Sequence, residues 1–227
     1  MEQSSSKVHG LDQTRHIGSR PQIEHTNLSL LVYWVLCTVV GFALLWNDIS
    51  SWRVATAWQN YGWLALVALV TTILSQIPYM MVSSGNGRPI APVSSTIFVI
   101  VNGAIEAFVF LGCYNLLFNL SKLVFGDLNI VNFIFGLFGF IFYSGFIHAF
   151  FWARLIPPHF SANPKLQPLR RMMPFVQITI VVGWCIYYYF TADIWTVVAL
   201  HALVDGVLMF WVRPPVLFAQ RKTAAVK

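Results

Sequence analysis

The sequence predicts an all-α membrane protein, a polytopic bundle of about six transmembrane helices. Of its 227 residues, 57% are hydrophobic and only 10% are charged, and the mean hydropathy is +0.67. Six apolar segments are each about long enough to cross a hydrocarbon layer of roughly 30 Å. Lys and Arg lie in the connections beside these segments. The net charge of +6 therefore indicates how the chain is oriented in the membrane and that it contacts anionic lipid. Nucleic acid is not an expected partner.

The first half of the chain has clear boundaries. Residues 1–27 are polar and predict a mobile cytosolic tail, and the apolar run at 28–46 predicts the first span. The connection at 47–60 carries three aromatic or basic residues suited to lying at the membrane interface, although an ordinary loop fits as well. The second span is expected at 61–82, where the glycines and prolines of 83–92 end the helix.

Four further spans follow. They are expected at 95–120, 130–152, 174–192 and 194–212, with a proline-rich loop at 154–171 before the fifth span. Asp193 alone separates the last two spans and is expected to cap the sixth helix. The sequence therefore predicts a single transmembrane bundle at 28–212, followed by a basic cytosolic tail at 213–227.

The distribution of basic residues predicts the orientation. In this six-span arrangement, 12 of the 14 Lys and Arg residues lie in the two tails and in the connections on the same side. Cytosolic loops carry the excess of Lys and Arg, so both termini are expected in the cytosol. Tryptophans near the span ends are typical of an interfacial aromatic belt. They are Trp46, Trp63, Trp152, Trp195 and Trp211.

Three spans carry ionisable side chains at membrane depth. Glu106 lies in the third span, His148 in the fourth, and His201 with Asp205 in the sixth. Such residues are costly in a bilayer and normally face a protein interior or cavity. At a rise of about 1.5 Å per residue, Glu106 lies about ten residues, and His201 about eleven, from the cytosolic ends of their spans. We therefore expect all four side chains to converge on a cavity in the cytosolic half of the bilayer.

Each of these residues also has a structural explanation. Glu106 could hydrogen-bond Asn102, which lies one helical turn before it, and His148 could be an interfacial histidine. His201 and Asp205 are four residues apart on one helix face and could satisfy each other.

The same residues resemble the motifs of a known family. The run at 106–112, Glu-Ala-Phe-Val-Phe-Leu-Gly, is similar to the Glu-Glu-x-x-Phe-Arg-Gly signature of the type II CAAX prenyl endopeptidases and bacteriocin-processing proteases, a family of glutamate intramembrane proteases. His148 lies where the second-motif histidine of that family would follow. The run at 201–205 resembles the closing His-x-x-x-Asn/Asp motif. The resemblance covers about residues 96–212 and keeps the motif order.

This resemblance implies catalytic roles for four residues. Glu106 and His148 would activate a water molecule, while His201 and Asp205 would polarise the scissile carbonyl or hold the oxyanion. The chain departs from the pattern at Ala107, Leu111 and Ser144, where the family has glutamate, arginine and phenylalanine. The missing charges would help to fix and tune the first glutamate.

Three functions remain open from the sequence. The first is a divergent intramembrane endopeptidase that needs no cofactor and cleaves a membrane-associated or lipidated peptide. The second is a non-catalytic scaffold of the same fold that binds a membrane protein, a pigment or a lipid. The third is an intramembrane metal site, since histidine and carboxylate groups are ligands for iron, zinc or manganese. In each case we expect a multi-pass membrane protein with its site open to the cytosolic side, and the sequence predicts no oligomeric state.

Overall fold

The predicted apolar segments all form helices in the computed structural model, which describes residues 23–83, 90–152 and 159–213, with side chains described from residue 28. Six of these helices are long and apolar enough to cross a membrane. The all-α, polytopic fold class predicted from the sequence is therefore confirmed. The helical elements are α1 (Ile23–Ser50), α2 (Val54–Val82), α3 (Pro92–Phe125), α4 (Asn129–Ile147), η1 (His148–Trp152), η2 (Pro164–Leu166), α6 (Gln167–Thr191), α7 (Ile194–Val207) and η3 (Leu208–Val212).

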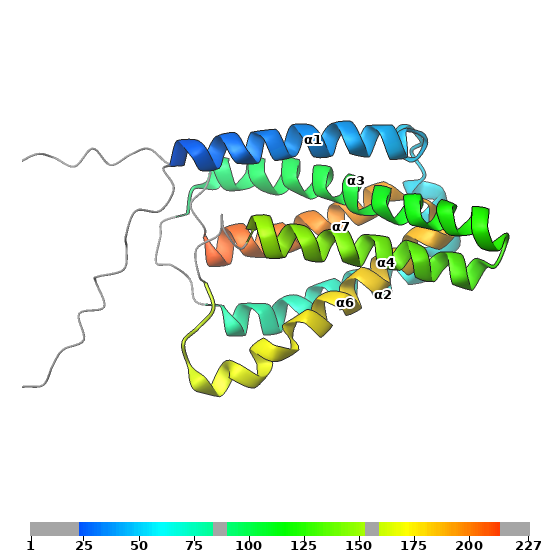
Figure 1. Cartoon of the computed structure of the whole chain (residues 1–227). Helices are drawn as coiled ribbons and strands as arrows, with labels where there is room; N and C mark the ends of the chain where they lie inside the picture. The colour runs from blue at the N-terminus through cyan, green and yellow to red at the C-terminus, as the bar shows by residue number, and fades with distance from the viewer. Residues whose placement is uncertain (1–22, 84–89, 153–158, 214–227) are drawn as a thin grey trace, which may run out of the picture.

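Helix α3 organises the bundle. It packs against α1, α4 and α7, while α2 packs against α6 and α7 (Figure 1). The start of α1, the start of α3 and the end of η3 lie at the same end of the bundle (Figure 1). Since α3 is also the most buried of the six spans, a polar side chain near its middle is surrounded by protein on several sides.

The connection expected at 47–60 is shorter in the structure. Helix α1 continues to Ser50 and α2 begins at Val54, so most of this segment is helical. The sequence from 47 to 60 holds neither proline nor glycine, so nothing in it stops a helix. The helix path bends instead at Tyr61, whose φ of −134° and ψ of 26° are not helical.

The proline-rich loop expected at 154–171 is also partly helical. Residues 153–158 lie outside the described residues, but a short 3₁₀ turn begins at Pro164 and continues into α6. Pro164 and Pro168 both occupy first-turn positions, where a backbone N–H is not needed. Similarly, α1 begins at Ile23, so the last residues of the predicted tail are helical. Residues 1–22 and 214–227 of the two predicted tails lie outside the described residues.

The cap predicted for the sixth span is confirmed. The Asp193 carboxylate accepts hydrogen bonds from the backbone N–H groups of Trp195 and Thr196 at the start of α7. It also accepts from the hydroxyl groups of Tyr187 and Thr196, both at 2.6 Å. This cap fixes the α6–α7 hairpin, and with it the direction in which α7 returns through the bundle.

Candidate functional site

Glu106 lies in the core of the bundle. Its side chain on α3 is only 1% exposed. One carboxylate oxygen, Oε1, accepts hydrogen bonds from the Tyr33 hydroxyl at 2.5 Å and from the Trp152 indole Nε1 at 2.8 Å. The two donors come from α1 and η1, so two other elements of the bundle hold this oxygen.

Asn102 connects Glu106 to a second carboxylate. Its amide Nδ2 donates to Glu106 Oε2 and to Asp205 Oδ2, both at 2.9 Å. Its Oδ1 accepts from the indole Nε1 of Trp34 at 2.9 Å, which fixes the amide with its NH₂ group toward the carboxylates. The expected contact between Asn102 and Glu106 is confirmed, and it extends across the interface between α3 and α7.

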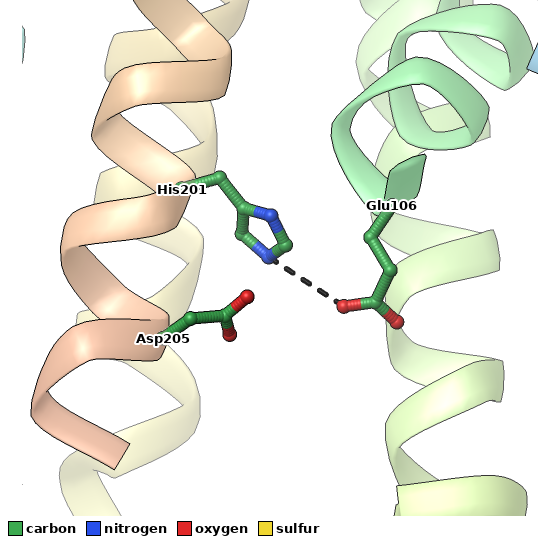
Figure 2. Close-up of side chains that lie close together, drawn as sticks. All are labelled: Glu106, His201 and Asp205. Carbon is green, nitrogen blue, oxygen red and sulfur yellow. Dashed lines mark ion pairs between the residues drawn. The ribbon is translucent and has the colours of Figure 1, made fainter. Parts of the chain in front are cut away.

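His201 is oriented by the backbone of α3. Its Nδ1 lies 3.1 Å from the carbonyl oxygen of Gly103, which can only accept, so Nδ1 carries a hydrogen. The other ring nitrogen, Nε2, faces Glu106 Oε2 at 3.6 Å (Figure 2). The helices approach closely at this point because Gly103 has no side chain, and a Cβ there would lie 2.8 Å from Ala202.

Glu106, His201 and Asp205 therefore form one buried group, which we call the acid–histidine cluster. Their ligand atoms lie within 4.8 Å of one another (Figure 2). His201 and Asp205 are each 5% exposed. The convergence of these three residues, expected from their depths along the helices, is what the structure shows. Their catalytic role and the expected cytosolic opening stay predictions.

His148 does not join the cluster. It is exposed at the start of η1, where its Nδ1 lies 2.6 Å from the carbonyl oxygen of Ser144. The Phe110 ring neighbours both histidines, with its centroid 6.3 Å from that of His148 and 5.5 Å from that of His201. The expected pairing of His148 with Glu106 is thus absent from the structure.

Trp152 takes the inward position instead. Residues four apart share a face on a regular α-helix, which would place His148 and Trp152 together. In the structure the chain from His148 to Trp152 forms a π-helical turn, where His148 is exposed while Trp152 is only 7% exposed. The interpretation of Trp152 as an interfacial anchor is therefore wrong, because its indole N–H binds Glu106.

Helix α1 also contributes to the site, which the sequence did not predict. Tyr33 and Trp34 are adjacent, and each donates a hydrogen bond to a polar group of α3. They lie in the predicted span at 28–46, which holds no Asp, Glu, Lys, Arg or His. The available signal was their polar groups: a hydroxyl or an indole N–H buried in lipid or protein normally has a partner.

The fold and the cluster together define a polytopic membrane protein with a buried acid–histidine centre. The chain matches no known family, no curated protein and no solved structure.

Proposed function

We propose that the chain is a cation-binding membrane protein and that the acid–histidine cluster is its binding site. The hydrogen-bond pattern around the two carboxylates supports this proposal. In the described segments, neighbouring side chains form four hydrogen bonds with Glu106 or Asp205, and the carboxylates accept all of them, from Tyr33, Trp152 and Asn102. Each of these partners donates, which is compatible with ionised carboxylates, since those only accept.

Two such charges need compensation. At a separation below 4.8 Å, two carboxylates repel by roughly 3 to 4 kcal/mol at an effective dielectric constant of about 20. Within the described segments, no Lys or Arg forms an ion pair with either carboxylate, and His201 is the one basic group beside them. A bound cation would offset the repulsion, and the same two negative charges would attract it to the site.

The dependence of stability on cations tests the proposal. A ligand that binds only the folded state raises the free energy of unfolding as its concentration increases. We expect the melting temperature of the wild type in detergent to depend on a cation, whether a proton, a monovalent ion or a divalent ion. The double variant Glu106→Gln, Asp205→Asn should lose that dependence, because the amides keep the size but not the charge.

The matched control is Asp127→Asn. Asp127 is an exposed acid in the connection between α3 and α4, and it pairs with Lys122 near the end of α3. This variant should retain the cation dependence of the wild type. An identical response of the wild type and the double variant to every cation tried would contradict the proposal.

A divergent endopeptidase is the second candidate. The observation that favours it is the juxtaposition of Glu106 and His201, at 3.6 Å, in the motif order that resembles the CAAX endopeptidases. Less favourable to it is the burial of Glu106, which is only 1% exposed and has both carboxylate oxygens already engaged by hydrogen bonds.

The comparison of Glu106→Gln with Glu106→Ala tests that candidate in a cell-based assay of membrane-protein processing. A peptidase should lose processing in both variants while the protein still accumulates, since proton transfer contributes about 10²-fold or more to the rate. A fully active Glu106→Gln protein would exclude the peptidase and favour the non-catalytic scaffold, in which the glutamine oxygen can still accept from Tyr33 and Trp152.

A further inference from the structure

We propose that the cation is a divalent transition metal ion, bound by Glu106 Oε2, His201 Nε2 and the Asp205 carboxylate. This inference rests on the proposed function and names the chemical class of its ligand. Three features of the acid–histidine cluster support it: the spacing of the ligand atoms, the groups that orient them, and the balance of charge.

The spacing fits ligands on one ion better than a direct contact. Nε2 and Oε2 are 3.6 Å apart. A charged N–H···O hydrogen bond would measure about 2.7–2.9 Å, and a contact of about 3.6 Å is too long for one. Two ligands on a tetrahedral ion, at about 2.0–2.2 Å from the metal, stand about 3.4 Å apart. The third ligand atom lies within 4.8 Å of the others, so a movement of the Asp205 side chain by at most about 1.4 Å completes the set.

The orienting contacts are those of a metal-bound histidine. A metal ligand of this type usually donates its second ring N–H to a carbonyl or carboxylate, which fixes the ring and its tautomer. His201 does this through Nδ1 and the carbonyl oxygen of Gly103 at 3.1 Å. With the hydrogen on Nδ1, the neutral ring leaves the lone pair of Nε2 facing Glu106.

The carboxylates are held in a similar way. Tyr33 and Trp152 occupy the Oε1 side of Glu106 and leave Oε2 on the side of His201. Asn102 donates one hydrogen to Oε2 and the other to Asp205 Oδ2, so a single amide sets both carboxylates. Each oxygen can accept a second partner, so these hydrogen bonds are compatible with metal binding.

The charge and the donor types identify the class of ion. Two carboxylates and a neutral imidazole carry a charge of −2, which a divalent ion balances, whereas a protonated histidine would balance only half. One nitrogen and two carboxylate oxygens suit zinc, manganese or iron, while copper(I) prefers sulfur. The buried thiol of Cys37 does not belong to the group of ligand atoms.

Elemental analysis of the purified full-length protein tests the inference. The protein should be extracted in mild detergent with an affinity tag that lacks histidine. We expect about one equivalent of a single divalent metal per chain, and at least a tenfold loss of affinity in His201→Gln and in Asp205→Asn. His148→Gln is the control, because it changes the same residue type on the exposed surface.

Titration of chelator-treated wild type adds a readout that does not depend on the variants folding. Zn²⁺, Mn²⁺ and Co²⁺ are the probes, and a binding ion should raise the melting temperature. Bound Co²⁺ should show the visible absorption of a four- or five-coordinate ion with nitrogen and oxygen ligands. The same titration of His148→Gln should give the wild-type result.

The outcomes separate the two proposals. Metal retained equally in His201→Gln and in the wild type would overturn the inference, because the ion would then bind elsewhere. The inference would also fail if the wild type held no metal and none of the three ions raised its melting temperature. If the melting temperature of the wild type still depended on protons or Na⁺ while that of the Glu106→Gln, Asp205→Asn variant did not, the cation-binding proposal would stand without a metal. If no cation did, both would fail.

Discussion

The substitution Gly103→Ala probes the contact on which the acid–histidine cluster depends. A Cβ at this position would lie 2.8 Å from both the Cα and the Cβ of Ala202, and 3.1 Å from its backbone nitrogen. Ordinary carbon contacts begin near 3.5 Å. Since backbone atoms of Ala202 take part in the clash, no side-chain rotation relieves it, and α3 and α7 must separate by roughly 0.7 to 1 Å.

The separation affects the hydrogen bond that orients His201. The distance from Nδ1 to the Gly103 oxygen would rise from 3.1 Å to about 4 Å, beyond hydrogen-bonding range. Overpacking costs about 1 to 3 kcal/mol, and a lost hydrogen bond about 0.5 to 1.5 kcal/mol. We therefore expect Gly103→Ala to lower the free energy of unfolding by about 1.5 to 4.5 kcal/mol.

The assay is thermal or denaturant unfolding in detergent, followed by tryptophan fluorescence. Gly206→Ala on α7 is the matched control, because a Cβ there meets no atom within 4 Å. That change should be neutral or stabilising by up to about 1 kcal/mol, as alanine favours helix formation. A Gly103→Ala protein as stable as the control would refute the reasoning about close packing at the cluster.

Three further predictions follow from other contacts. Trp152→Phe keeps an aromatic ring but removes the donor to Glu106, so it should destabilise the protein by about 1.5 to 3 kcal/mol in the same unfolding assay. The control His148→Phe, on an exposed residue, should change the free energy of unfolding little. Asp193→Ala removes the cap of α7 and should cost about 1 to 2 kcal/mol or more; a melting temperature equal to that of the wild type would contradict the role of the cap. Accessibility labelling should place both termini in the cytosol and a reporter beside Asp127 on the opposite side, and the reverse pattern at any of the three positions would contradict the predicted orientation.

The sequence alone determined the fold class and the depth of the polar groups. Long apolar runs in water-excluding surroundings must form helices, because only a helix satisfies its own backbone hydrogen bonds in lipid. A constant rise per residue then places Glu106 and His201 at the same depth, and the structure brings them to 3.6 Å. Asp193 was predictable as a cap for the same local reason, since capping involves only neighbouring residues.

Helix ends were less predictable. Prolines 164 and 168 suggested a loop, but both occupy first-turn positions, and α6 begins several residues before the predicted fifth span. The sequence marks residues that are unfavourable inside a helix; it does not say whether they fall inside the helix or at its start.

Only the tertiary structure decided which side chains reach the acid–histidine cluster. The direction in which a residue points depends on helix rotation and on local departures from the α-helical repeat. His148 and Trp152 are four residues apart in one π-helical turn, yet Trp152 is buried against Glu106 while His148 is exposed. Tyr33 and Trp34 reach Glu106 and Asn102 because α1 packs beside α3, a long-range contact that depth along a helix cannot predict.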